Sequence, residues 1–287
     1  MNSRALTLTV MAMTAFAGNS LLCRAALNQT EIDAASFTSI RLIAGALVLW
    51  LIVRLRASRA EDQGAGQSAV GGNWWSALAL FAYAAGFSYA YVSLAAGTGA
   101  LLLFGAVQVT MIGYGIYRGE RLRGIQLIGL LMAFGGLIGL MLPGLESPPL
   151  FGSVLMLGAG VAWGVYSLRG RGAGDATVVT AGNFLRSVPL ALLLSALMYS
   201  YWSLDVAGVG YAVASGALAS GVGYAIWYTA LPLLKSTTAA TVQLSVPVIA
   251  AIGGVILLSE PLTLRMALAS VAILGGIALV ILEKQAR

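Results

Sequence analysis

The sequence predicts an all-α membrane protein with ten transmembrane helices, arranged as two inverted five-helix repeats. Three observations support this fold class: very few charged residues, ten apolar segments joined by short connections, and a second half that repeats features of the first. We expect the repeats to occupy residues 1–145 and 146–287 of a single integral membrane unit.

The composition excludes most water-soluble proteins. Of the 287 residues, 59% are hydrophobic and 9% are charged, whereas a soluble domain carries about 25% charged residues. At roughly 20 residues per helix, the chain is long enough for about ten spans. A β-barrel would show segments of about ten residues in which apolar and polar residues alternate. The segments here are longer and apolar on all sides, which favours helices.

The first half contains five apolar segments, and short polar stretches separate most of them. These stretches read NQTEID, SRAEDQGAGQ and RGERLRG, and PGLESPP follows the fifth segment. The expected spans of this half are residues 5–26, 35–56, 73–96, 98–117 and 124–142.

The second half has the same organisation, with RGRGAGD, LLKST and SEPLT among its polar stretches. The chain contains 36 glycines, as is typical of helices that pack closely in lipid. The expected spans of this half are residues 150–168, 176–200, 206–231, 237–258 and 264–283.

The positions of Lys and Arg predict the orientation, because positively charged loops stay cytoplasmic. If both termini are cytoplasmic, twelve of the sixteen basic residues fall in cytoplasmic regions. The outer loops then hold Arg24 and Arg265, while Arg41 and Arg186 lie within spans. Residues 56–72 and 169–176 are therefore expected on the cytoplasmic side.

The first segment has an alternative interpretation as a secretory signal. Arg4 precedes an apolar run, and Ala15-Phe16-Ala17 resembles a cleavage site. Removal would leave a mature chain that begins near Gly18. The charge distribution needs this segment to be a true span, and the internal repeat needs it as the partner of residues 150–168. Both arguments favour a true span.

The internal repeat is clearest with a shift of 140 residues. This shift pairs Glu120 with Glu260, in RGERL and SEPLT, and pairs the two glycines at 135–136 with those at 275–276. Shifts of 145 and 146 pair Arg41 with Arg186 and Gly18 with Gly164. Five spans is an odd number, so the two halves enter the membrane in opposite directions.

These motifs resemble the drug/metabolite transporter superfamily. They are the glycine-centred FAGNS and AWGVYS of the first and sixth spans, the arginine in the second and seventh, and the Glu-containing loops RGERL and SEPLT. The chain is most similar to EamA-type members and, among them, to bacterial amino-acid exporters. The resemblance implies a basket around a central cavity, with the fifth and tenth spans outside its wall. One departure is Arg121, which replaces the usual proline after the Glu of the inner loop.

Polar and aromatic residues near mid-membrane are the candidates for cavity lining, since transporter sites lie near the midplane between repeats. Asn19 and Ser20 follow Gly18 at the depth of the Trp163–Gly164 pair. Tyr83, Phe87 and Tyr91 recur every four residues, which places them on one helical face. Packing alone remains an alternative for these aromatic residues.

The buried arginines and amides have two interpretations each. Arg41 and Arg186 either attract a substrate carboxylate or bind neighbouring carbonyls, and Arg41 could also snorkel to the outer headgroups. Buried amides either face the cavity or form interhelical hydrogen bonds. The expected substrate-binding residues are Asn19, Ser20, Arg41, Tyr83, Phe87, Tyr91, Gln108, Trp163, Arg186, Tyr224 and Gln243.

The sequence favours a secondary transporter that exports amino acids, including aromatic and apolar ones, by alternating access. No acid lies mid-span and no ATP-binding P-loop is present. Glu120 and Glu260 are expected to cap helices or form loop ion pairs. A membrane-embedded enzyme is disfavoured, because the chain has no histidine and one cysteine. Nucleotide sugars, phosphate esters or drugs are the alternative cargo.

We expect no cofactor, no metal and no nucleic-acid partner. The expected partners are small-molecule substrates and the lipid bilayer, with a monomer favoured. The resemblance implies a bacterial inner-membrane location.

Overall fold

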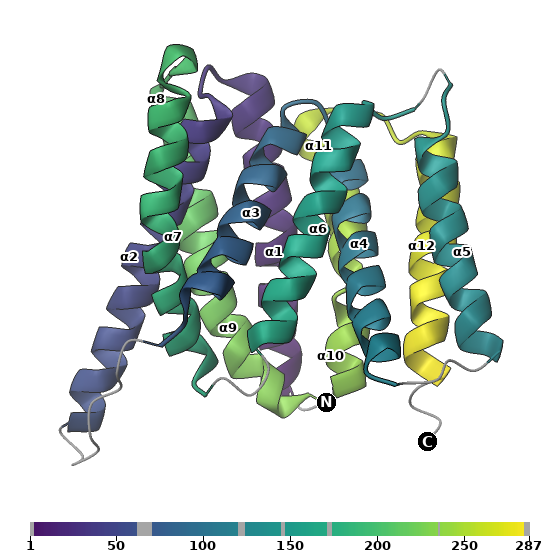
Figure 1. The fold of residues 1–287 in the computed structure, drawn as a ribbon, viewed down its shortest axis with the longest axis horizontal. Helices are drawn as coiled ribbons and strands as arrows, with labels where there is room; N and C mark the ends of the chain where they lie inside the picture. The colour runs from purple at the N-terminus through teal and green to yellow at the C-terminus, as the bar shows by residue number, and fades with distance from the viewer. Residues whose placement is uncertain are drawn as a thin grey trace.

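A computed structural model describes residues 3–61, 71–119, 124–144, 147–170, 174–234 and 236–283. Within these ranges every regular element is a helix, and there is no strand. The helices run roughly parallel and antiparallel to one another in a single bundle, and α1 begins at the end where α12 finishes (Figure 1).

The first half forms five helices. They are α1 (Ser3–Gln29), α2 (Ala34–Glu61), α3 (Trp74–Tyr91), α4 (Ala96–Tyr117) and α5 (Gly124–Met141). Asn and Asp residues begin several helices, as expected for residues whose side chains accept bonds from free backbone N–H groups. Asp33 accepts from the N–H groups of Ala35 and Ser36, and Asn73 accepts from that of Ser76.

The second half forms five helical stretches, two of them irregular. Its elements are α6 (Leu150–Gly170), α7 (Ala176–Leu197), η1 (Tyr199–Tyr201), α8 (Val206–Ala214), η2 (Ser215–Val222), α9 (Gly223–Ala230), η3 (Leu231–Leu233), α10 (Ser236–Val242), α11 (Ser245–Leu258) and α12 (Leu264–Glu283). Residues 206–233 form one continuous helix whose middle, η2, is a π-helical segment. The chain between α10 and α11 leaves the helix at residues 243–244.

Eight of the described helices are long and apolar enough to cross a membrane. They include the continuous helix of residues 206–233 but not α3 or α11. The third expected span, α3, is rich in Trp and Tyr, and α11 has 14 residues after the break. The expectation of an all-helical chain is confirmed, whereas the count of ten spans stays a prediction.

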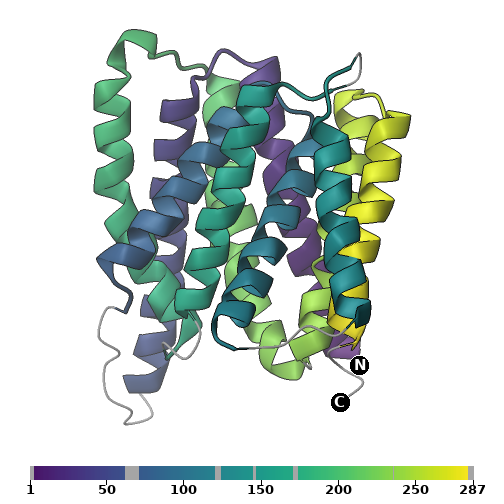
Figure 2. The same cartoon turned by 45° about the vertical axis from the view of Figure 1, so that its right-hand side comes forward.

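Helix packing divides the bundle into a main body and one outlying pair. The main body includes contacts of α6 with α3 and α4, of α1 with α8, α9 and α11, and of α2 with α7 and η2. The outlying helices α5 and α12 pack tightly on each other, and Figure 2 shows them together at one side of the bundle. Gly129 and Gly276 allow this close approach, because a Cβ on either would collide with the other's carbonyl oxygen.

Candidate functional site

Asn19 connects three helices in the middle of the bundle. Its side chain is 6% exposed. Its Oδ1 accepts a hydrogen bond from Ser215 Oγ at 2.6 Å, and its Nδ2 donates to the Tyr83 hydroxyl at 3.3 Å. A side-chain amide has two donor hydrogens and two acceptor lone pairs, so Asn19 keeps capacity for a further partner. Ser20, the next residue, is also buried.

The π-helical segment η2 brings Ser215 to Asn19 and lies directly on α2. A Cβ on Gly216 would collide with the carbonyl oxygen of Arg41, so only glycine permits this contact. π-Helical turns are rare and occur frequently at functional sites. Here the π-helical turn places a hydroxyl beside Asn19 and holds α2 at Arg41.

Aromatic rings from α3, α6 and α9 meet next to Asn19. On α3, the rings of Tyr83 and Phe87 are 5.4 Å apart, and those of Phe87 and Tyr91 are 4.7 Å apart. The indole of Trp163 lies 4.8 Å from the Tyr83 ring and stacks on Tyr224 at 5.5 Å. These separations are typical of favourable ring pairs. The helical face predicted from the spacing of the α3 aromatics points into this cluster.

Arg41 is buried among these rings. It is 2% exposed, and its guanidinium carbon lies 4.8 Å from the ring centre of Phe87 and 5.4 Å from that of Tyr83. The side chain therefore does not snorkel to the outer headgroups, and that alternative is wrong. We define the central cluster as Asn19, Arg41, Tyr83, Phe87, Tyr91, Trp163, Ser215 and Tyr224.

Two donor groups of Arg41 are unsatisfied. Its Nε and Nη1 are buried and make no hydrogen bond to the described residues. A buried donor without a partner costs about 1–3 kcal/mol, and a charge in the membrane interior usually marks a functional site. Within the described part of the chain, Arg24 and Glu260 form an ion pair, whereas no carboxylate lies within ion-pair distance of Arg41.

The other expected site residues lie elsewhere. Arg186 Nη1 donates to the carbonyls of Gly71 and Gly182, at 2.8 and 2.9 Å. Gln108 is buried on α4, and Gln243 donates to the Ala239 carbonyl beside the helix break. In the described ranges no ring contact or hydrogen bond joins these three to the central cluster.

A second polar group lies next to the central cluster, and the sequence did not predict all of its members. The Tyr166 hydroxyl donates to Thr180 Oγ1 at 3.4 Å, and Thr180 Oγ1 donates to the Tyr228 hydroxyl at 3.1 Å. The buried amide of Asn183 donates to the Tyr166 hydroxyl. The spacing of four residues between Tyr224 and Tyr228 could have revealed Tyr228, because the same spacing revealed the α3 face. No sequence signal singled out Ser215, since its contact depends on the π-helical turn.

Two apolar hollows, of about 450 and 620 Å³, lie away from the central cluster. One is lined by α4, α5 and α6, and the other lies between α5 and α12. Neither includes a residue of the central cluster. Glu120 and Arg121, the other residues singled out in the inner loop, lie outside the described residues.

Comparison with known proteins relates the second half of the chain to a transporter family. Residues 150–282 match the EamA-like transporter family. The chain is 57% identical to the uncharacterized protein PA1977 of Pseudomonas aeruginosa, over 99% of this chain and 96% of that one. It is 33% identical to the threonine/homoserine exporter RhtA of Escherichia coli over 133 residues, which is 44% of each chain.

The fold also has a counterpart among solved structures. One crystal structure superposes with a TM-score of 0.64 at 20% identity, and the match covers 97% of this chain and 99% of the other. That likeness shows a shared fold over the whole chain. The sequence match shows that the second half of the chain, residues 150–282, belongs to the EamA-like transporter family.

Proposed function

We propose that this chain is a secondary transporter that exports amino acids, including aromatic and apolar ones, by alternating access. The observation that carries the proposal is Arg41, a buried cation with two free donors and no carboxylate partner among the described residues. The match of residues 150–282 to the EamA-like transporter family supports transport as the activity, and similarity to the threonine/homoserine exporter RhtA supports amino acids as the cargo.

The chemistry of the central cluster suits an amino acid. A carboxylate oxygen can accept a hydrogen bond from Nε or from Nη1 of Arg41, and hydrogen bonds between an ionised donor and a carboxylate are short and strong. The spare capacity of Asn19 and the ring faces of Trp163 and Tyr224 suit the ammonium group, which is attracted to hydrogen-bond acceptors and aromatic faces. The surrounding rings offer apolar contact to the side chain of the substrate.

Helix packing supports the proposed arrangement in two inverted halves. In an inverted repeat, each contact within the bundle has a counterpart made by the equivalent helices of the other half. The contacts of α6 with α3 and α4 correspond in this way to the contacts of α1 with α8–α9 and α11. Exchanging the halves would also map the pairs α2–α7 and α5–α12 onto themselves. In the proposed orientation both termini are cytoplasmic and the protein lies in a bacterial inner membrane.

Other cargo would make different demands on the site. A nucleotide sugar carries two phosphates and would need several cations. Among the residues that define the central cluster, Arg41 is the one cation. A single monocarboxylate group therefore matches the charge of the cluster better than a diphosphate does.

Transport by purified protein in liposomes tests the proposal. Liposomes loaded with labelled threonine, homoserine, leucine or phenylalanine should release label only when the protein is present. Arg41→Gln should reduce release by about 30-fold or more, because loss of one partner from a buried charge pair costs about 2–5 kcal/mol. Arg54→Gln is the matched control, since Arg54 lies on the same helix over the ring of Trp50 and away from the cluster.

Two outcomes would overturn the proposal. One is the absence of transport of every amino acid in the panel by the folded wild-type protein. The other is unchanged release by Arg41→Gln, which would remove the carboxylate site.

A further inference from the structure

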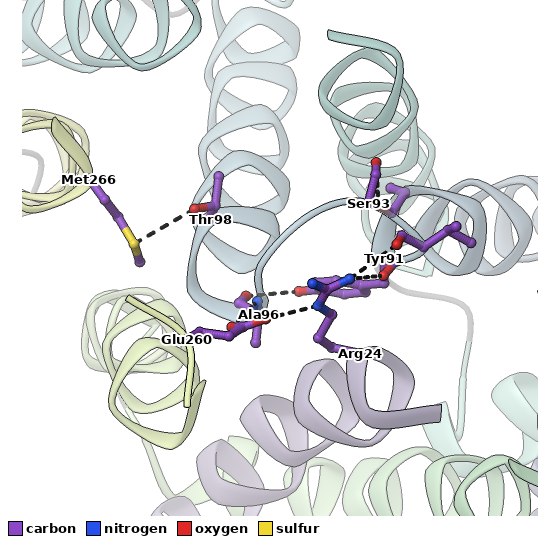
Figure 3. A network of polar contacts seen from close by, with 9 residues as sticks. Arg24, Tyr91, Ser93, Ala96, Thr98, Glu260 and Met266 are labelled. Carbon is purple, nitrogen blue, oxygen red and sulfur yellow. Dashed lines mark hydrogen bonds and ion pairs between the residues drawn. The ribbon is translucent and has the colours of Figure 1, made fainter. Parts of the chain in front are cut away.

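A second charged group lies at the end of the bundle opposite the start of α1. Arg24, near the end of α1, places its Nε 2.8 Å from Glu260 Oε1. The two side chains are 13% and 12% exposed. The Nη1 of Arg24 also donates to the carbonyls of Tyr91 and Val92, at 3.0 and 3.1 Å (Figure 3).

The second oxygen of Glu260 holds the beginning of α4. Its Oε2 accepts from the backbone N–H of Ala96 at 2.7 Å. Ala95, the residue before α4, has no side chain that could cap the helix. A carboxylate at this position compensates the free N–H groups and the positive end of the helix dipole. Arg24 and Glu260 thus tie together α1, α4, the end of α3 and the segment after α11.

The local sequence brings Glu260 back over its own helix. Ser259 ends α11 in the left-handed conformation, with φ of 54°, and the N–H of Glu260 then bonds to the Gly254 carbonyl at 3.0 Å. This turn is a common helix ending, and the proline that follows prevents further helix. A Cβ on Gly254 would lie 2.7 Å from Glu260 Oε2. The glycine therefore leaves room for the carboxylate.

One residue, Tyr91, links this charged group to the central cluster. Its carbonyl accepts from Arg24, and its hydroxyl donates to the Ala96 carbonyl at 3.1 Å. Its ring packs edge-on against Phe87, which lies beneath the guanidinium of Arg41. The three aromatics of α3 therefore form a continuous connection between Arg41 and the ion pair.

The geometry points to an outer gate formed by Arg24 and Glu260. In this inference, which rests on the proposed transport function, the ion pair closes the outer end of the central cluster and must separate before substrate leaves. Separation frees the end of α1 from α3, α4 and α11 in one step, because these contacts share the two side chains. Re-formation of the pair closes the outer side before the next substrate enters from the cytoplasm.

Cys23 is a built-in reporter of the gate. It is the single cysteine of the sequence, it is fully buried, and it immediately precedes Arg24. Membrane-impermeant maleimide added from outside should label Cys23 slowly in the wild-type protein. Glu260→Gln should accelerate labelling at least about tenfold, which corresponds to a shift of about 1.4 kcal/mol toward the open state.

Two further variants separate gating from general damage. Gly254→Ala keeps both charges but displaces the Glu260 carboxylate, so it should also accelerate labelling. Arg265→Gln is the matched control, because Arg265 is at the same end of the bundle and bonds to the Leu142 carbonyl, outside the gate. It should label as slowly as the wild type.

The labelling assay contains no cargo, so its result is independent of the proposed function. Accelerated labelling without any amino-acid transport would support the gate and reject the cargo. Wild-type labelling rates in folded Glu260→Gln and Gly254→Ala would overturn the gate, whatever the cargo. If Glu260→Gln does not fold, Gly254→Ala decides the question. Each rate is referred to complete labelling in detergent-denatured protein.

Discussion

Replacing Arg41 by methionine should stabilise the protein while abolishing transport. Arg41 is buried with two unsatisfied N–H groups, and its guanidinium contacts the rings of both Tyr83 and Phe87. Methionine is unbranched, fills irregular gaps and makes favourable contacts between sulfur and aromatic rings. The substitution therefore removes an uncompensated charge and keeps contact with both rings.

The size of the effect follows from opposing contributions. Burying an ion costs several kcal/mol after relaxation, and each of the two unsatisfied donors contributes about 1–3 kcal/mol to that cost. Two desolvated cation–π contacts offset up to about 4 kcal/mol of it. We expect the free energy of unfolding of Arg41→Met to rise by about 2 kcal/mol, which raises the melting midpoint by about 4–8 °C.

The assay is thermal unfolding of purified protein in detergent, paired with efflux from liposomes. Arg54→Met is the control, because Arg54 is exposed on the same helix and should leave both measurements unchanged. A midpoint for Arg41→Met several degrees below that of the wild type would refute the reasoning. It would show that the guanidinium stabilises the fold, as a purely structural arginine does.

Three further predictions test separate parts of the molecule. Asn19→Ala should reduce efflux and lower the unfolding free energy by about 1–3 kcal/mol, because its two buried partners lose their bonds. Trp163→Phe should impair efflux with a smaller change in melting midpoint. Unimpaired efflux by both variants would show that these residues contribute to packing only. Arg186→Ala should lower protein yield, and Arg186→Lys should restore part of it; a well-folded Arg186→Ala without transport would indicate a substrate role. The orientation is tested in a protein whose own cysteine is replaced by alanine. A cysteine placed at Ser203 should react with an impermeant reagent from outside, and a cysteine placed at Ser58 should not. The reverse pattern would reject the proposed orientation.

Much of the helical organisation followed from the sequence alone. The spacing of apolar segments predicted most helices close to the positions where they occur, because helices satisfy all backbone polar groups internally. The expected span at 237–258 is the exception, since the helix is interrupted at residues 243–244. The paired motifs FAGNS and AWGVYS pointed to the first helix of each half, and Asn19 and Trp163 do meet the same group of rings. The interpretation of Glu260 as an ion pair and helix cap was also right.

Other features depended on contacts between distant parts of the chain. The sequence alone left three roles open for Arg41: binding a substrate carboxylate, bonding to neighbouring carbonyls, or snorkelling to the headgroups. An arginine buried among rings and one at a lipid surface have the same sequence pattern along a single helix. Arg186, its counterpart in the repeat, bonds to two backbone carbonyls instead. The two arginines therefore occupy equivalent positions in the repeat but have different neighbours in the folded bundle.

The sequence by itself determined that the chain is a helical bundle with few charges, and it determined which residues are unusual in such a bundle. The tertiary structure decided which of these residues meet. The π-helical turn at Ser215 has no periodic signature in the sequence. The helix break at residues 243–244 has a local cause in Pro247, which lacks the N–H that a continuous helix would bond to the Gln243 carbonyl. A side chain's electrostatic partner is fixed by neighbours far away along the chain, so only the folded bundle shows that Arg24 has a carboxylate and Arg41 has two free donors.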